Sequence, residues 1–354
     1  MKLENLGWDH FFEKHFAQYQ VLGYRPLRII RENRLKYLAI GDQGEFKCEV
    51  TGKFRNKAGG KGNYPAVGDW VAVKMCPNEA KAMIHQVLPK KSAFIRKVAG
   101  TITEEQVVAS NIDVVFIVCG LDLNYNLRRI ERYLALAWES GAQPVVLLNK
   151  ADICEKLDQY KSEVESIAVG VSIYTISATQ NQGLEIINTY VQMGKTAVFL
   201  GSSGVGKSTI INSLLAFEQF RINDVSELGS RGRHTTTFRK LVFLPNGGML
   251  IDTPGMREVQ VWGEDVGLKQ VFDDIEQLAT QCKFRDCQHQ NEISCAVLKA
   301  KEAGTIDQNR YNSYMKLKSE FSYLEARQIM KPNALEKTRW KKISKQIKLL
   351  EKDY

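Results

Sequence analysis

The feature that most constrains the fold of this chain is a glycine-rich segment at residues 201–208. It follows the apolar run 196–200 and opens a stretch that favours a helix. In this strand–loop–helix setting the pattern is that of a phosphate-binding loop, whose glycines let backbone N–H groups converge on phosphate at the positive end of a helix. The residues expected at the phosphates are Gly201, Ser202, Ser203, Gly204, Val205, Gly206, Lys207, Ser208 and Thr209. Lys207 is expected to reach the outer phosphates, and Ser208 to supply a hydroxyl to Mg²⁺.

Strands and helices alternate before and after this loop. The apolar runs 113–119 and 144–148 are typical of strands buried on both faces. Apolar residues between 127 and 138 recur at helical spacing, and a second helix is expected near 183–193. This alternation predicts a parallel α/β sheet covered on both faces, with its ligands at the carboxyl ends of the strands.

The segment that distinguishes the base is Asn149-Lys150-Ala151-Asp152, directly after a predicted strand. A carboxylate at Asp152 can accept hydrogen bonds from guanine N1–H and the exocyclic amine together, a pair that adenine does not offer. A companion segment, Ser177-Ala178-Thr179, follows the next strand. Together they predict a guanine-nucleotide site and argue against a P-loop ATPase or kinase.

A third nucleotide segment is Asp252-Thr253-Pro254-Gly255, at the end of the predicted strand 248–251. Asp252 suits a role beside Mg²⁺, and the Gly255 N–H suits the γ-phosphate. The turn at 245–248 predicts that residues 238–244 pair antiparallel to this strand.

Residues 230–237, rich in glycine, arginine and threonine, lie between the phosphate loop and this hairpin. Thr235 or Thr236 is expected to close on Mg²⁺ with GTP bound, and the spacing favours Thr236. The alternative is a plain mobile loop.

The order of these segments is unusual. In most GTPases the phosphate loop comes first, whereas here residues 149–179 precede residues 201–255. A closed domain can be cut and rejoined in this way without changing its sheet if the old termini lie close together. The sequence therefore predicts a circularly permuted G domain that leads directly into the C-terminal region.

The N-terminal part contains short strands with turns between them. The runs 35–40, 45–50, 70–73 and 82–88 suit a small β-barrel, of which the oligonucleotide-binding (OB) type is one option and a docking block another. The glycine- and lysine-rich segment 57–64 is predicted to be a mobile, basic loop.

A metal-binding pattern follows the G domain. Cys282, Cys287, His289 and Cys295 lie within fourteen residues, with the spacing Cys-x₄-Cys-x-His-x₅-Cys. Three thiols and one imidazole form a closed tetrahedral set for one structural Zn²⁺ per chain, with no open position for catalysis. The alternative is a group of reduced thiols near a surface histidine.

Length and charge add two constraints. A chain of 354 residues favours two or three domains, and a net charge of +9 favours a polyanionic partner, although a solvated basic surface explains the charge as well. In the tail 331–354, Lys and Arg outnumber Asp and Glu by eight to three. We see no secretory segment or bilayer-spanning run, so we expect a cytoplasmic protein with reduced thiols.

These motifs, their rotated order and the cysteine–histidine spacing together resemble the ribosome small subunit-dependent GTPase A family. The resemblance covers nearly the whole chain. It implies an OB-type β-barrel (1–95), a circularly permuted α/β P-loop GTPase domain (96–272) and an α-helical zinc-binding domain (273–354). It also implies a monomeric late maturation factor of the 30S subunit, which contacts 16S rRNA and whose GTPase activity the subunit stimulates.

The resemblance also bears on catalysis. Met256 follows the 252–255 segment, where many GTPases place a water-orienting glutamine. A methionine cannot orient water, and the family suggests His234 as the substitute. The rival reading is a passive RNA-binding assembly protein that binds nucleotide and hardly turns it over.

Overall fold

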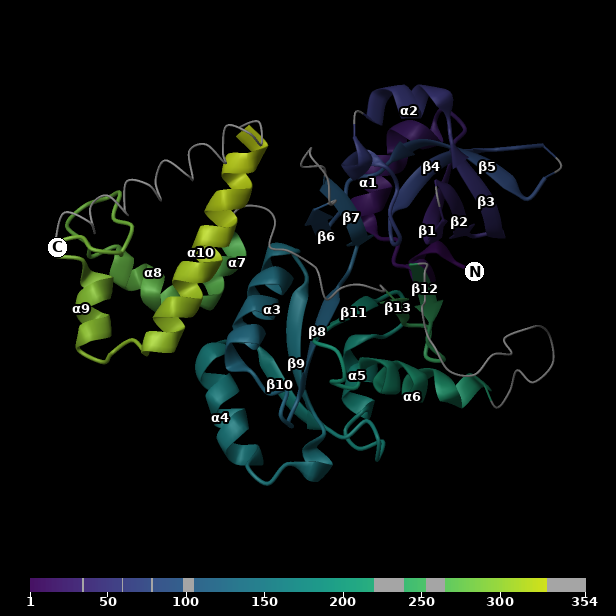
Figure 1. The fold of residues 1–354 in the computed structure, drawn as a ribbon. Coiled ribbons are helices and arrows are strands. Elements are labelled where there is room, and N and C mark those ends of the chain that lie inside the picture. Colours follow the sequence, from purple (N-terminus) through teal and green to yellow (C-terminus); the bar gives the residue numbers. More distant parts are fainter. Residues whose placement is uncertain are drawn as a thin grey trace.

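The N-terminal strands of the computed structural model form a closed barrel, at the upper right of Figure 1. The structure describes residues 1–33, 35–58, 60–77, 79–97, 105–219, 239–252 and 265–329. The barrel strands are β1 (Arg25–Asn33), β2 (Lys36–Gly41), β3 (Gly44–Val50), β4 (Trp70–Met75) and β5 (Lys81–Val87). Their order is β1-β2-β3-β5-β4, and β4 pairs back onto β1. The predicted OB-type barrel is confirmed.

Alternating apolar side chains fill the barrel. Leu27 and Ile29 of β1 and Val71 and Val73 of β4 point into one buried cluster, as the two-residue period of a strand requires. Between β3 and β4 the chain forms helix α2 (Gly52–Ala58) and the 3₁₀ turn η2 (Lys61–Asn63). The prediction of a mobile loop over residues 57–64 is therefore wrong for residues 57–58, which end α2, and for residues 61–63, which form η2. Phe54 and Ala58 of α2 pack in the barrel core.

Four further elements were not predicted. The N-terminal segment forms a 3₁₀ turn, η1 (Leu3–Leu6), and helix α1 (His10–Gln20), which the Asp9 carboxylate caps by accepting from Phe11 N–H. Phe12 and Phe16 of α1 are buried beside Trp70 of β4. A two-stranded sheet, β6 (Ala93–Lys97) and β7 (Glu105–Ser110), connects the barrel to the next domain.

The central domain contains the predicted α/β sheet. Its strands are β8 (Val114–Gly120), β9 (Gln143–Asn149), β10 (Ser172–Ile176), β11 (Thr196–Leu200), β12 (Lys240–Phe243) and β13 (Met249–Asp252). They lie in the order β10-β9-β8-β11-β13-β12. All neighbours run parallel except β12, which forms the predicted antiparallel hairpin with β13.

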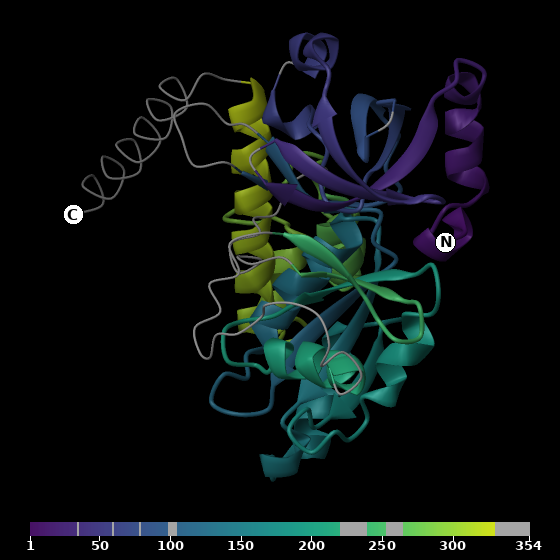
Figure 2. The ribbon, with the colours of Figure 1, turned by 90° about the vertical axis from the view of Figure 1, so that its right-hand side faces the viewer.

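Helices cover both faces of this sheet, as Figures 1 and 2 show. They are α3 (Leu127–Glu139), α4 (Leu157–Ile167), α5 (Glu185–Tyr190) and α6 (Lys207–Gln219). Alternate residues of β8 enter different cores: Val115 and Ile117 pack with α3 and α4, and Phe116 and Val118 pack with α5 and α6. This double burial is why the strand is apolar throughout.

The barrel and the α/β sheet are joined. β1 pairs with β12 at Arg31 and Lys240, so a single sheet runs from one domain into the other. Beside this junction lies Arg28, a fully buried arginine whose side chain is 1% exposed. Its five N–H groups reach partners in both domains. The acceptors are Gly68 O (3.3 Å), Leu6 O (2.5 Å), Met249 Sδ (3.4 Å), Asn111 O (3.1 Å) and Thr196 Oγ1 (2.9 Å).

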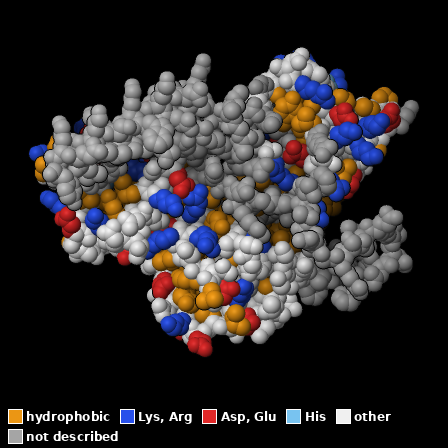
Figure 3. Space-filling view, viewed as in Figure 1, with side chains coloured by type: hydrophobic (Ala, Val, Ile, Leu, Met, Phe, Trp, Pro, Cys, Tyr) orange, Lys and Arg blue, Asp and Glu red, His pale blue; other side chains and the backbone are white. Residues whose placement is uncertain are grey.

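The C-terminal helices are α7 (Val266–Val271), α8 (Asp273–Ala279), α9 (Ala296–Glu302) and α10 (Gln308–Ile329). Of these, α7 and α10 pack against α3, and α8 packs with α9. Arg132 of α3 pairs with Glu320 of α10, and Figure 3 shows basic side chains gathered over this region. Helix α7 lies before residue 273, the boundary expected for the C-terminal domain, and packs on α3 of the central domain. No helix within the described ranges is long and apolar enough to cross a membrane.

The network around Arg28 predicts a large effect of a conservative substitution. Arg28→Lys keeps the charge but leaves several buried acceptors unpaired, because an ammonium cannot reproduce the guanidinium fork. We expect the free energy of unfolding, measured by urea denaturation, to fall by about 3 kcal/mol. The control is Arg25→Lys on the exposed start of the same strand. Equal, small effects of both variants would contradict the structural role of Arg28.

Candidate nucleotide site and metal centre

The phosphate loop lies between β11 and α6 in the conformation that its glycines permit. Gly201, Gly204 and Gly206 have φ values of +153°, +77° and +101°. The Lys207 Nζ atom donates to Gly201 O at 2.7 Å and to Ser202 O at 2.6 Å, so its ammonium group lies over the loop. The next residues, Ser208 and Thr209, are exposed in the first turn of α6. Backbone donors, a lysine and a hydroxyl therefore share one accessible helix N-terminus.

The buried side chain of Asn149 ties three loops together. Its Nδ2 donates to Val205 O of the phosphate loop at 2.7 Å, and its Oδ1 accepts from Ala178 N at 3.0 Å. A Cβ atom at Gly206 would lie 2.2 Å from Asn149 Nδ2, so only glycine allows this approach. The structure thus gives Asn149 a positioning role between the base-reading and phosphate segments.

The pairing of β8, β9 and β10 determines where the loops after these strands begin. Gly120, Asn149 and Ile176 are paired neighbours at the ends of β8, β9 and β10. The segments that follow therefore emerge side by side at one edge of the sheet. Here Asp152 is exposed, whereas Ser177 is buried and bonds to Thr179 through their hydroxyls at 3.1 Å.

Asp122, which follows β8, also lies at this edge of the sheet and was not among the predicted site residues. Its Oδ2 accepts from Lys150 Nζ at 2.6 Å, and its Oδ1 accepts from Asn124 N at 3.0 Å. The hydrogen bond from Lys150 lowers the pKa of Asp122. Lys150 has a left-handed backbone, with φ +69°, and its Asp122 partner fixes the direction of the side chain. The signal available in the sequence was an acidic residue at the end of a buried strand.

The remaining predicted nucleotide residues fall into two groups. Asp252 ends β13, next to β11, at the expected edge of the sheet. His234, Thr235, Thr236 and Gly255 lie outside the described residues. Their roles stay predictions.

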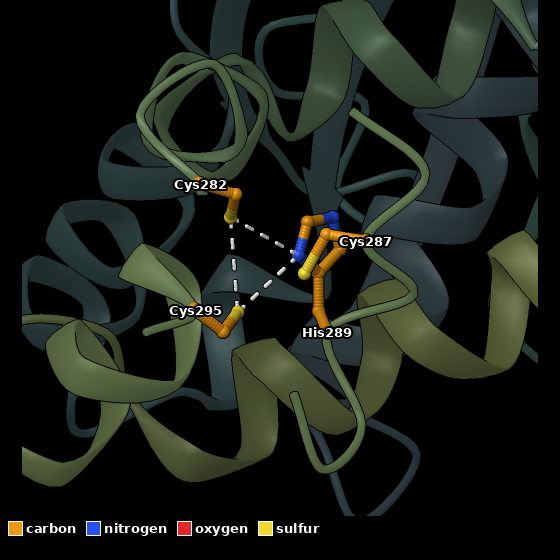
Figure 4. A group of neighbouring side chains, drawn as sticks. All are labelled: Cys282, Cys287, His289 and Cys295. Atoms are coloured by element: carbon orange, nitrogen blue, oxygen red, sulfur yellow. Dashed lines mark hydrogen bonds between the residues drawn. The ribbon is translucent and has the colours of Figure 1, made fainter. Parts of the chain in front are cut away.

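The second site brings together the four predicted metal ligands, between α8 and α9 (Figure 4). Their ligand atoms all lie within 4.8 Å of one another. Cys282 Sγ is 3.8 Å from Cys295 Sγ, and His289 Nδ1 is 3.7 Å from Cys282 Sγ and 3.5 Å from Cys295 Sγ. A tetrahedral Zn²⁺ with ordinary bond lengths requires about 3.8 Å between sulfurs and about 3.6 Å between sulfur and nitrogen. The cluster can therefore hold a metal ion such as zinc.

The surroundings favour the metal-binding form at Cys282 and His289, whereas burial raises the pKa of the Cys287 thiol to about 11. Burial raises the pKa of the Cys282 thiol, but hydrogen bonds from the N–H groups of Ala296 and Val297 and from the Cys295 and Cys287 side chains act in the opposite direction, and the net pKa is lowered. Burial lowers the pKa of His289, which favours the neutral imidazole. Thiolate and neutral imidazole are the metal-binding forms.

A carboxylate shapes the metal loop. Glu292 accepts from the backbone N–H groups of Gln288 (2.9 Å), Gln290 (2.8 Å) and Asn291 (3.1 Å). These bonds lower the pKa of Glu292. His289 lies inside this turn with a left-handed backbone, and its carbonyl accepts from Tyr311 of α10 at 2.6 Å.

Comparison with known proteins gives a consistent result. The profile of the RsgA GTPase family matches residues 87–262. The small ribosomal subunit biogenesis GTPase RsgA 1 of Oceanobacillus iheyensis is 44% identical over 322 residues, covering 91% of this chain and 92% of the relative. The RsgA of Opitutus terrae is 41% identical over 352 residues, covering 97% and 96%.

Solved structures agree on the fold. YjeQ from Thermotoga maritima has 28% identity and a TM-score of 0.59, covering 83% of this chain and 97% of that one. YloQ, described as a circularly permuted GTPase, has a TM-score of 0.58 at 22% identity, covering 86% and 96%.

The fold and the site define a circularly permuted P-loop GTPase with an N-terminal barrel and a C-terminal metal-binding helical domain. The chain belongs to the RsgA GTPase family and is a GTP-hydrolysing enzyme. The family resemblance seen in the motifs is confirmed.

The metal site predicts that the purified protein carries one Zn²⁺ per chain. Glu292→Gln should release zinc to a chelator several-fold faster, because a neutral amide holds the loop N–H groups less strongly than a carboxylate. Metal analysis gives the stoichiometry, and a colorimetric chelator gives the release rate. The matched control is Glu302→Gln at the end of α9. Equal release rates for the two variants would contradict the role of Glu292.

Proposed function

We propose that this enzyme binds GTP at the edge formed by the ends of β9, β10 and β11. Asp152 reads the guanine base, and Lys150 lies along it with Ser177, Ala178 and Thr179. The phosphate loop 201–209 holds the phosphates, with the Gly255 N–H at the γ-phosphate. Ser208, Asp252 and Thr235 or Thr236 hold Mg²⁺ directly or through water. The contact of Asn149 with both Val205 and Ala178 carries this proposal, since it fixes the base and phosphate segments relative to one another.

We further propose that the protein acts in biogenesis of the small (30S) ribosomal subunit. The relatives from Oceanobacillus iheyensis and Opitutus terrae are named for this role, and they align with nearly the whole chain. A net charge of +9 suits contact with 16S rRNA. In this proposal a cytoplasmic monomer binds the subunit with GTP, the subunit stimulates hydrolysis, and hydrolysis releases the protein.

The catalytic proposal is that His234 orients the attacking water, because Met256 cannot. A histidine can do so by hydrogen bonding without removing a proton. The C-terminal site then acts as a structural zinc staple, because four protein ligands leave no open position for chemistry. The proposed division of labour is a barrel (1–95), a G domain (96–272) and a zinc-binding domain (273–354).

The base-reading role predicts a change of nucleotide preference. Asp152→Asn should weaken GTP binding and improve binding of xanthosine triphosphate, whose ring offers the complementary acceptor. Asp122→Asn is the matched control: it weakens only the ion pair that directs Lys150, so it should raise the Kd for GTP several-fold with no gain for xanthosine triphosphate. Titration with fluorescent nucleotide analogues measures both. If Asp152→Asn keeps wild-type GTP affinity, the base-reading role is wrong.

The proposed cycle predicts slow intrinsic GTP turnover and a large stimulation by 30S subunits. His234→Ala should lose most of the stimulated rate while it keeps GTP affinity and subunit binding. Phosphate release with and without subunits measures the rate, and co-sedimentation measures binding. A wild-type rate that subunits leave unchanged would favour the passive assembly protein. A variant with full stimulated turnover would remove His234 from the mechanism.

A further inference from the structure

A groove of about 920 Å³ lies on the barrel between α1 and α2. Figure 2 shows these helices standing apart on the barrel, α1 in purple and α2 in dark blue. The walls include His15 and Tyr19 from α1, Lys53 and Lys57 from α2, and residues of β5 and the chain after it. This surface is distinct from the nucleotide site and from the metal cluster.

The lining of this α1–α2 groove is basic. It includes three lysines, and none of its residues is Asp or Glu. Lys90 pairs with the buried Asp69 at 3.4 Å. Lys53 and Lys57 are exposed on α2, and no ion pair to either is formed among the described residues. The groove therefore presents uncompensated positive charge.

Aromatic rings lie in a row along the groove. The ring centroids of Tyr19 and Tyr24 are 6.0 Å apart, and those of Tyr24 and His85 are 5.0 Å apart. The Lys74 ammonium lies 5.1 Å from the centre of the Tyr24 ring. Rings beside cations are the combination that binds single-stranded nucleic acid, because bases stack on the rings while the cations meet the phosphates.

In this protein, the face on which OB barrels usually bind their ligand lacks an excess of positive charge. OB barrels bind oligonucleotides on the face of their second and third strands. Here the exposed side chains of those strands include Glu45 and Glu49 as well as Lys36 and Lys47, and Lys36 stands opposite Glu49 in the register. The acidic and basic side chains offset one another, so this face gives little attraction for a polyanion.

We infer that single-stranded RNA binds in the α1–α2 groove rather than on the β2–β3 face. Its phosphates contact Lys53 and Lys57, and a base stacks on Tyr19 or Tyr24. The inference rests on the proposed function and deepens it, since it names the surface of the barrel that takes the RNA. An acidic protein segment would form ion pairs with the lysines, but its carboxylates would not stack on the aromatic rings.

The test uses the full-length protein and a labelled single-stranded RNA of about 12 nucleotides, within the span that one OB fold covers. Fluorescence anisotropy measures affinity at several salt concentrations. Lys53→Glu/Lys57→Glu should weaken binding at least about tenfold and make the salt slope shallower by about 1.4. Lys36→Glu/Lys47→Glu, with the same change in charge on the β2–β3 face, should weaken it no more than about threefold. Tyr19→Leu tests stacking and should weaken binding several-fold.

Equal losses in the two double variants would overturn the inference, because the effect would then come from general charge. Polyglutamate that competes as well as unlabelled RNA, with no effect of Tyr19→Leu, would identify an acidic protein segment as the ligand and also overturn it. Basal GTP turnover is measured on the same samples and should be unchanged in the groove variants. If the wild-type protein does not hydrolyse GTP, the proposed function is contradicted, but the inference that RNA binds in the α1–α2 groove is not.

Discussion

The buried guanidinium of Arg28 is the interaction on which the domain arrangement depends. Its hydrogen bonds end on η1, the barrel, the entry to β8, β11 and β13. Burial lowers its pKa to about 10, while Asp113 and Asp69 act in the opposite direction, so the group is charged at neutral pH. A buried charge is tolerated only where its donors are satisfied, which here requires both domains to be in place. The arginine therefore disfavours alternative placements of the barrel.

A second set of charges holds the C-terminal domain against α3. Glu131 of α3 is fully buried, and Arg310 of α10 pairs with it at 2.9 Å and with Asp274 of α8 at 2.6 Å. Burial raises the pKa of Glu131, opposed by its cationic partners. Removing one partner of such a group leaves a desolvated charge, so the network specifies how α10 meets α3.

The sequence predicted what short segments determine by themselves. The phosphate loop, the Asn149–Asp152 segment, the buried strands and the metal ligands each depend on residue types at close spacing. The signal for α1 was also local, since Asp9 is a helix cap and Phe12 and Phe16 are one turn apart. The network of Arg28 could not be predicted, because its partners lie in other segments and only the assembled fold brings them together. For Asp122 the sequence offered its place at the end of a buried strand, but its pairing with Lys150 also depends on the assembled fold.

The nucleotide site is compatible with the rotated order of its segments because the site is formed by loops at the ends of strands. The sheet, and not the order along the chain, determines where those strand ends lie. What the rotation changes is the path by which the chain leaves the domain. After β13 the described chain resumes at α7, which packs on α3. Asn126 and Arg129 at the start of α3 line the same small cavity as Ser202 and Val205 of the phosphate loop. One helix thus begins beside the phosphate loop and contacts α7 and α10 further along its length, so α3 is the element that links the phosphate loop to the C-terminal helices.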